Sequence, residues 1–159
     1  RDRASRWMRT RMTLYFPDVN VWLALSVVDH SHNAVAWKWL RSLPGDVRLV
    51  FSRYTQLGVL RLLANAAVTG TQPLTLREAW NAYDQWMEDP RVDFYPEPRN
   101  IDSAFRAAMK PFATKPAPAW VGDCWLLAFA EETGATLVTF DRALLDFARK
   151  QGHSAVMPR

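Results

Sequence analysis

The chain has 159 residues, of which 49% are hydrophobic and 23% charged, so it is not an intrinsically disordered protein and is long enough for one domain with a sizeable core. Its single cysteine excludes an internal disulfide framework. No apolar run approaches the roughly 18 residues that a membrane span requires. We therefore expect a cytoplasmic protein with no membrane partner.

The net charge of +4 is concentrated at the N-terminus. Residues 1–11 carry five arginines and one aspartate, whereas residues 12–159 hold 15 basic and 15 acidic side chains. The basic balance is therefore poor evidence that the remainder of the chain binds polyanions. We expect residues 1–11 to be a basic extension and residues 12–159 to form a single domain.

Short apolar and β-branched runs alternate with helical patterns along the chain. Strands are predicted at 13–16, 47–51, 91–95, 135–140 and 154–157. Helices are predicted at 20–28, 32–43, 52–64, 75–87, 103–109, 121–133 and 142–150, with Ser52, Thr75 and Asp102 as caps and Gly134 as a stop. Three prolines predict irregular structure at 110–118. The alternation predicts an α/β sandwich around a central, mainly parallel sheet.

Three aspartates occupy positions where a parallel sheet places its sites. Asp18 follows the first strand, Asp141 follows the fourth, and Asp123 lies near the start of a helix. Each alone has a simpler interpretation as a helix cap. If the strands are neighbours, however, the three acids converge at one rim, where their repulsion requires a cation. All-oxygen ligands suit Mg²⁺ or Mn²⁺, which can activate water for phosphodiester hydrolysis.

Four sequence blocks carry a family resemblance: DVNVWLAL at 18–25, TQLGVLRLL at 55–63, GDCWLLAFA at 122–130 and LVTFDRAL at 137–144. Together and in this order they resemble the PIN-domain ribonucleases, in particular the VapC-type toxins of bacterial toxin–antitoxin pairs. The resemblance covers about residues 14–157. It implies a PIN-like three-layer α/β/α sandwich and a Mg²⁺- or Mn²⁺-dependent endoribonuclease. It also implies a homodimer that hydrolyses RNA and is inhibited by a small antitoxin of the VapB type.

The resemblance also implies roles for individual residues. Asp18, Asp123 and Asp141 match the family's metal-binding, catalytic acids. Thr139 matches a hydroxyl that orients the last acid, and Asn20 matches a polar residue beside the first.

The third predicted helix departs from the family pattern. Many PIN domains carry a glutamate near the position of Gly58, and Gln56 is the nearest polar substitute in this chain. Whether one metal ion acts or two is therefore open. Arg53 and Arg61, on the same helix, are candidates to contact RNA phosphates or an antitoxin carboxylate.

Other functions are compatible with the same residues. One is a PIN-fold binding module whose activity is impaired by the missing glutamate, and another is a DNA-directed PIN-like nuclease. A haloacid-dehalogenase-like phosphatase also places an aspartate after its first strand. That pattern needs a second aspartate two residues later, where this chain has Asn20, and a lysine that we cannot place convincingly.

Overall fold

The computed structural model describes residues 12–69 and 72–159. The basic extension expected at 1–11 lies outside the described residues, as do two residues of the loop expected between the third and fourth helices. None of the helices in the described part of the chain combines the length and apolar character needed to cross a bilayer.

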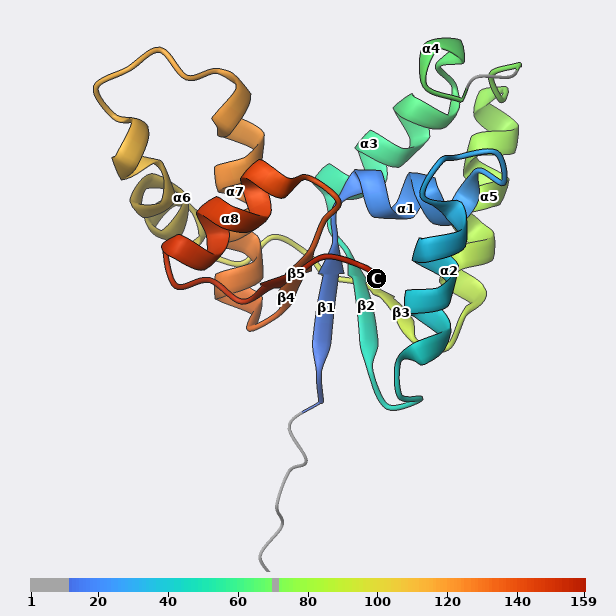
Figure 1. Cartoon of the computed structure of the whole chain (residues 1–159), viewed down its shortest axis with the longest axis horizontal. Coiled ribbons are helices and arrows are strands. Elements are labelled where there is room, and N and C mark those ends of the chain that lie inside the picture. The colour runs from blue at the N-terminus through green and yellow to red at the C-terminus, as the bar shows by residue number, and fades with distance from the viewer. Residues whose placement is uncertain (1–11, 70–71) are drawn as a thin grey trace, which may run out of the picture.

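Five parallel strands form one sheet in the order β3-β2-β1-β4-β5 (Figure 1). All five predicted strands are present; β1 is shifted by one residue from its predicted range, and the other four are shorter than predicted. Their bounds are β1 Leu14–Pro17, β2 Arg48–Phe51, β3 Val92–Phe94, β4 Thr136–Val138 and β5 Ala155–Val156. The prediction of a central parallel sheet is confirmed.

The helices cover both faces of this sheet. Figure 1 shows α1, α2, α3 and α5 on one side and α6, α7 and α8 on the other, which confirms the three-layer sandwich. Their bounds are α1 Val19–Ser26, α2 Asn33–Ser42, α3 Arg53–Leu63, α4 Ala66–Thr69, α5 Leu76–Glu88, α6 Ile101–Met109, α7 Ala119–Thr133 and α8 Arg142–Lys150.

Local capping signals fix several of the helix ends. The side chain of Ser52 accepts a hydrogen bond from the backbone of Thr55 and begins α3, and Thr75 and Glu78 form the predicted reciprocal capping box at α5. Gly134 ends α7 with a φ of 71°, a left-handed conformation that favours glycine.

Three sequence-based expectations were wrong in detail. Helix α6 begins at Ile101 after Asn100, so Asp102 lies in its first turn instead of capping it, where its charge still favours the helix dipole. The proline-rich segment contains a 3₁₀ helix at Lys110–Phe112, because proline is tolerated in the first turn of a helix. Helix α7 begins at Ala119, two residues earlier than expected, which places Asp123 in its second turn.

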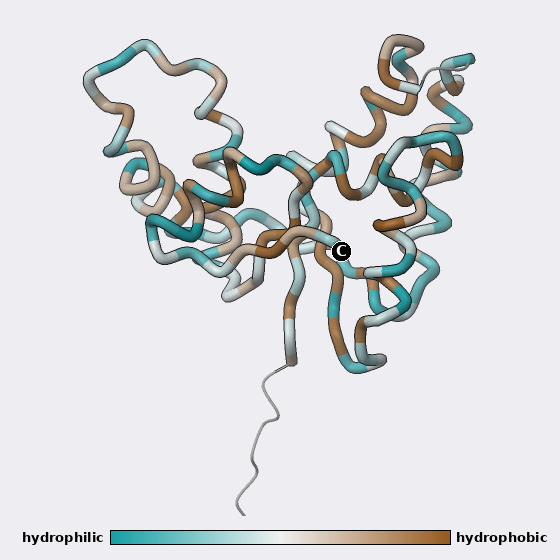
Figure 2. Tube along the Cα trace, viewed as in Figure 1, coloured by the Kyte–Doolittle hydropathy of each residue, from teal (hydrophilic) through white to brown (hydrophobic). Residues whose placement is uncertain are grey.

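The hydrophobic core is divided by the sheet into two clusters. On the α1 side, the buried rings of Trp22 and Phe51 stack with centroids 4.0 Å apart. On the α7 side, Phe16 packs on Phe129 with centroids 4.5 Å apart. Figure 2 shows hydrophobic residues recurring through the central strands and along the helices that cover them. Burial on both faces explains why the strands are continuous apolar runs instead of alternating ones.

The strand order reverses at the centre of the sheet. From β1 the chain proceeds outward through β2 and β3, and then returns to place β4 and β5 on the other side of β1. In open parallel sheets such a reversal leaves a crevice outside the carboxyl ends of the two central strands. Here those strands are β1 and β4, which are followed by Asp18 and Asp141.

Candidate active site

Asp18 is held at the carboxyl end of β1 by backbone and side-chain contacts. Its N–H donates to the carbonyl of Val138 on β4 at 2.8 Å. Its Oδ1 accepts from the N–H of Val19 at 2.6 Å and so caps α1. Its Oδ2 accepts from Asn20 Nδ2 at 3.2 Å and from Thr139 Oγ1 at 3.1 Å. The orientation of this carboxylate is therefore fixed by the strand end, the helix start and two side chains.

Asn20 and Thr139 link Asp18 to the loop that carries Asp141. Thr139 Oγ1 accepts hydrogen bonds from Asn20 Nδ2 at 3.3 Å and from the N–H of Asp141 at 3.0 Å. Asn20 Oδ1 accepts from the N–H of Phe140 at 3.2 Å. Asp141 in turn caps α8 through Oδ1. The two residues expected to support the acids thus join the ends of β1 and β4.

Asp123, on α7, lines a cleft of about 490 Å³ together with Asp18, and we call this space the acid cleft. Tyr54 and Arg61 of α3 also line it. The remaining lining residues are Val19, Leu57, Gly58, Leu62 and Leu126.

The three aspartates are close enough for the charge of one to affect the pKa of another. Burial raises the pKa of Asp18 to about 6, the charges of Asp123 and Asp141 add to this rise, and hydrogen bonds from Val19 and Thr139 oppose it. Burial likewise raises the pKa of Asp123, with a further contribution from Asp141. The structure therefore brings the three predicted acids within range of one another's charge.

The donor chemistry fits a hard divalent cation, because the rim supplies carboxylate oxygens that repel one another. Within residues 12–69 and 72–159, no three His, Cys, Asp or Glu side chains already form a complete metal-binding group. Asp18 uses both of its oxygens for hydrogen bonds, and Asp141 uses Oδ1 to accept from Leu144. The acids are thus gathered at one rim without being arranged as a finished coordination shell.

Arg53 and Arg61, the predicted contacts for RNA or an antitoxin, lie in different places. Arg61 lines the acid cleft. Arg53 lies over the ring of Phe94, with its guanidinium carbon 4.8 Å from the ring centroid, and donates to the amide oxygen of Gln56. Gln56 is buried and also hydrogen-bonds Tyr83, and it does not line the acid cleft. The side chain nearest in sequence to the missing glutamate is therefore engaged elsewhere.

The space beside Gly58 is already filled. A Cβ at Gly58 would lie 2.6 Å from Cγ2 of Val19, which is closer than real Cβ contacts allow. Glycine at 58 and valine at 19 therefore form a complementary pair, and the absence of the family's glutamate leaves no hole in this wall of the cleft.

Sequence reasoning missed Tyr54. It lies seven residues before Arg61, so helical periodicity places both on one face of α3, and this spacing was the available signal. Burial raises the pKa of the Tyr54 phenol, and the charges of Asp18 and Asp123 raise it further while Arg61 opposes them. A Cβ at Gly122 would overlap the Tyr54 hydroxyl, so the glycine before Asp123 makes room for the phenol.

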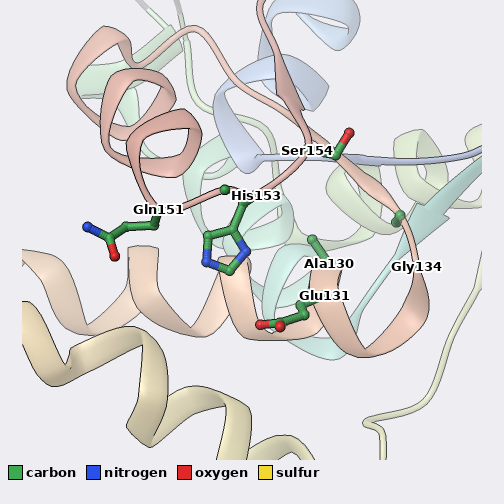
Figure 3. A pocket seen from close by; sticks show the side chains of 8 residues that line it. Ala130, Glu131, Gly134, Gln151, His153 and Ser154 are labelled. Atoms are coloured by element: carbon green, nitrogen blue, oxygen red, sulfur yellow. The ribbon is translucent and has the colours of Figure 1, made fainter.

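A second cavity, of about 240 Å³, lies at the opposite edge of the sheet (Figure 3). It is formed where α7 leads into β4 and where α8 leads into β5, at the amino ends of these strands. Its titratable lining residues are Glu131 and His153, and in Figure 3 the hydroxyl of Ser154 points away from both. The acid cleft is the stronger candidate because two carboxylates, Asp18 and Asp123, line it at the strand-order reversal and Asp141 lies close by.

Fold and site define the class of protein. The PIN domain family model matches residues 15–150, and the chain belongs to the PIN-domain family. This membership sets aside the haloacid-dehalogenase-like alternative.

Within this family, the chain is similar to VapC proteins. It is 38% identical to Ribonuclease VapC41 of Mycobacterium tuberculosis over 137 residues, which cover 82% of this chain and 90% of that protein. The fold matches the VapBC2 crystal structure from Rickettsia felis with a TM-score of 0.65 at 13% identity, covering 92% of this chain and 100% of the matched chain. It also matches Mycobacterium tuberculosis VapC20, a sarcin–ricin loop cleaving toxin, with a TM-score of 0.61 at 17% identity, covering 87% and 95%.

Proposed function

We propose that this protein is a metal-dependent endoribonuclease and the toxin of a toxin–antitoxin pair. The observation that carries the proposal is that Asp18 and Asp123 line one cleft at the strand-order reversal, while Thr139 hydrogen-bonds both Asp18 and the backbone of Asp141. Its similarity to Ribonuclease VapC41 supports RNA as the substrate.

The chain's own residues have distinct parts in this reaction. Asp18, Asp123 and Asp141 hold Mg²⁺ or Mn²⁺, which when bound supplies positive charge for the attacking and leaving oxygens of phosphodiester hydrolysis. Asn20 and Thr139 keep Asp18 oriented through the hydrogen bonds to Oδ2. Arg61, which lines the same cleft, would neutralise the phosphate that enters it.

Cleavage of a fluorescent RNA tests the proposal. Wild type should cleave RNA in Mg²⁺ or Mn²⁺, and Asp18→Asn and Asp123→Asn should each lower the rate by about 100-fold or more, in line with the contribution of preorganised charge. Asp146→Asn, which changes an exposed aspartate of α8, is the matched control and should retain the wild-type rate. Circular dichroism verifies the fold of each variant. Undiminished cleavage in excess EDTA would overturn the proposal, and a parallel DNA substrate separates it from a DNA-directed nuclease.

We also propose that a VapB-type antitoxin docks on the tryptophan-rich helices and that the toxin is a homodimer. A groove of about 390 Å³ between α1, α2 and α5 is suited to an amphipathic partner helix. It is lined by Leu25, Ser26, Val28, Trp37, Ala82, Gln85 and Trp86. Light scattering of the purified chain tests the dimer. Inhibition of cleavage by a purified VapB-type antitoxin, weakened by Val28→Lys, tests the antitoxin site.

A catalytically impaired binding module is the second candidate. It is favoured by the glycine at position 58 and by the incomplete grouping of metal ligands within 12–69 and 72–159. Isothermal titration with Mn²⁺ distinguishes the two functions. Binding that is lost in Asp123→Asn supports the nuclease, whereas RNA binding without any metal binding supports the module.

A further inference from the structure

Another pocket lies directly beside the acid cleft and shares two lining residues with it. It has a volume of about 300 Å³ and is lined by Ser52, Arg53, Tyr54, Leu57, Glu97, Trp125 and Phe129. Tyr54 and Leu57 line both spaces. We call this space the aromatic pocket. Its volume is at the lower end for ligand sites, which suits one small planar group better than a longer ligand.

Aromatic rings form the inner wall of this pocket. The ring centroids of Tyr54 and Trp125 are 5.1 Å apart with planes inclined by 32°, and those of Trp125 and Phe129 are 5.2 Å apart at 27°. Tyr54 remains 44% exposed although its phenol is seated against Gly122. The wall therefore offers a positioned aromatic face to solvent next to the acid cleft.

Two charged groups of opposite sign line the same pocket. The carboxylate of Glu97 accepts a hydrogen bond from the indole N–H of Trp125 at 3.3 Å and, because it has two oxygens, can accept further hydrogen bonds. The guanidinium of Arg53 is kept in place by the Phe94 ring and by Gln56. An aromatic face, a carboxylate and a guanidinium match the three parts of a nucleotide: the base plane, an amino edge and a phosphate.

We propose that the aromatic pocket binds one nucleobase of the RNA strand whose phosphate lies in the acid cleft, and that this base carries an exocyclic amino group. The inference deepens the proposed function and rests on it. A single strand is favoured as the occupant because the pocket continues into the cleft through Tyr54, so that a base and a neighbouring phosphate can be bound together. Glu97 accepts from the amino group of cytosine, adenine or guanine, whereas the corresponding edge of uracil presents a carbonyl.

Two labelled RNA pentamers, oligocytidine and oligouridine, test this inference in EDTA, where no cleavage occurs. Fluorescence anisotropy should show that wild type binds oligocytidine about tenfold more tightly than oligouridine, as a hydrogen bond to a charged group allows. Tyr54→Leu retains apolar bulk without an aromatic face and should weaken binding of both pentamers by about fivefold or more. Tyr54→Phe keeps the ring and should remain within about twofold of wild type for both pentamers.

Glu97→Gln, at an exposed position, provides a readout independent of packing and should reduce the preference for cytidine to within about twofold. Trp80→Leu is the matched control, because Trp80 is 45% exposed and does not line the aromatic pocket. Equal affinity of wild type for both pentamers, or unchanged affinity in Tyr54→Leu, overturns the inference. Metal-dependent cleavage in that case leaves the proposed function intact. Conversely, cytidine preference that requires Glu97 in a protein that cleaves nothing supports the pocket and refutes the nuclease.

Discussion

Asp18→Asn should stabilise the metal-free protein at alkaline pH while abolishing RNA cleavage. The reason is that the folded state raises the pKa of Asp18 from 3.8 to about 6. Folding therefore favours the protonated form, and the ionised carboxylate opposes folding. The penalty is absent below about pH 4, develops as the pH rises to 6, and is complete above it.

The size of this penalty follows from the change in pKa. A rise from 3.8 to about 6 corresponds to about 3 kcal/mol of unfolding free energy at pH 8. Asparagine caps helices as well as aspartate does, so the contact with Val19 survives the substitution. The Asn20 amide and the Thr139 hydroxyl both lose a charged acceptor, however, which together costs about 1–2 kcal/mol. A net gain of about 1–2 kcal/mol at pH 8 is expected.

Urea unfolding in EDTA at pH 4, 6 and 8 measures this gain, with Asp146→Asn as the control for loss of an exposed negative charge. The advantage of Asp18→Asn over wild type should shrink toward zero as the pH falls to 4. Saturating Mn²⁺ should reverse the order of stability, because ligand at 100 times its Kd stabilises the wild type by about 2.7 kcal/mol. The reasoning is refuted if Asp18→Asn is less stable than wild type at pH 8 in EDTA. It is also refuted if the difference in unfolding free energy between the two proteins does not change with pH.

Three further predictions concern the walls of the acid cleft. Gly58→Ala should destabilise the protein by about 1–3 kcal/mol through overlap with Val19; in a Val19→Ala background it should instead stabilise, as urea midpoints would show, and equal effects in both backgrounds would contradict the packing. Gly122→Ala should displace the phenol of Tyr54 and lower the thermal midpoint, and Tyr54→Phe should remove part of this cost. Asp123→Asn should lower the pKa of Tyr54, because a negative charge beside the phenol is lost; the ultraviolet difference titration against Tyr54→Phe measures it, and an unchanged pKa would contradict the proximity.

The parts of the fold that sequence predicted are those governed by local chemistry. The helix beginning after Ser52 has its start fixed by a capping box within four residues. The end of α7 is fixed by Gly134, because glycine adopts its φ of 71° without steric cost. The wrong cap at Asp102 shows the limit of such reasoning, because Asp is favourable both at the cap and in the first turn, and the sequence does not distinguish them.

The site was predictable only where residues follow strand ends. The positions of Asp18 and Asp141 at the carboxyl ends of apolar runs, together with the family resemblance, were sufficient to predict their meeting. The aromatic pocket was not predictable, because it depends on a contact between side chains of α3 and α7, two helices that cover opposite faces of the sheet. Tyr54 and Trp125 are 71 positions apart, and neither lies at the end of a strand.

Asp18 combines a stabilising role and a destabilising one in the same carboxylate. As the cap of α1 it accepts the N–H of Val19, and that hydrogen bond lowers its pKa. Burial and the charge of Asp123 raise its pKa, and the effect of burial is larger than that of the hydrogen bond from Val19. A residue selected for the helix alone would be asparagine or serine, which cap equally well without a charge. Retaining a carboxylate at a buried position where the fold opposes ionisation is therefore the strongest physical reason behind the proposal that this rim binds a cation.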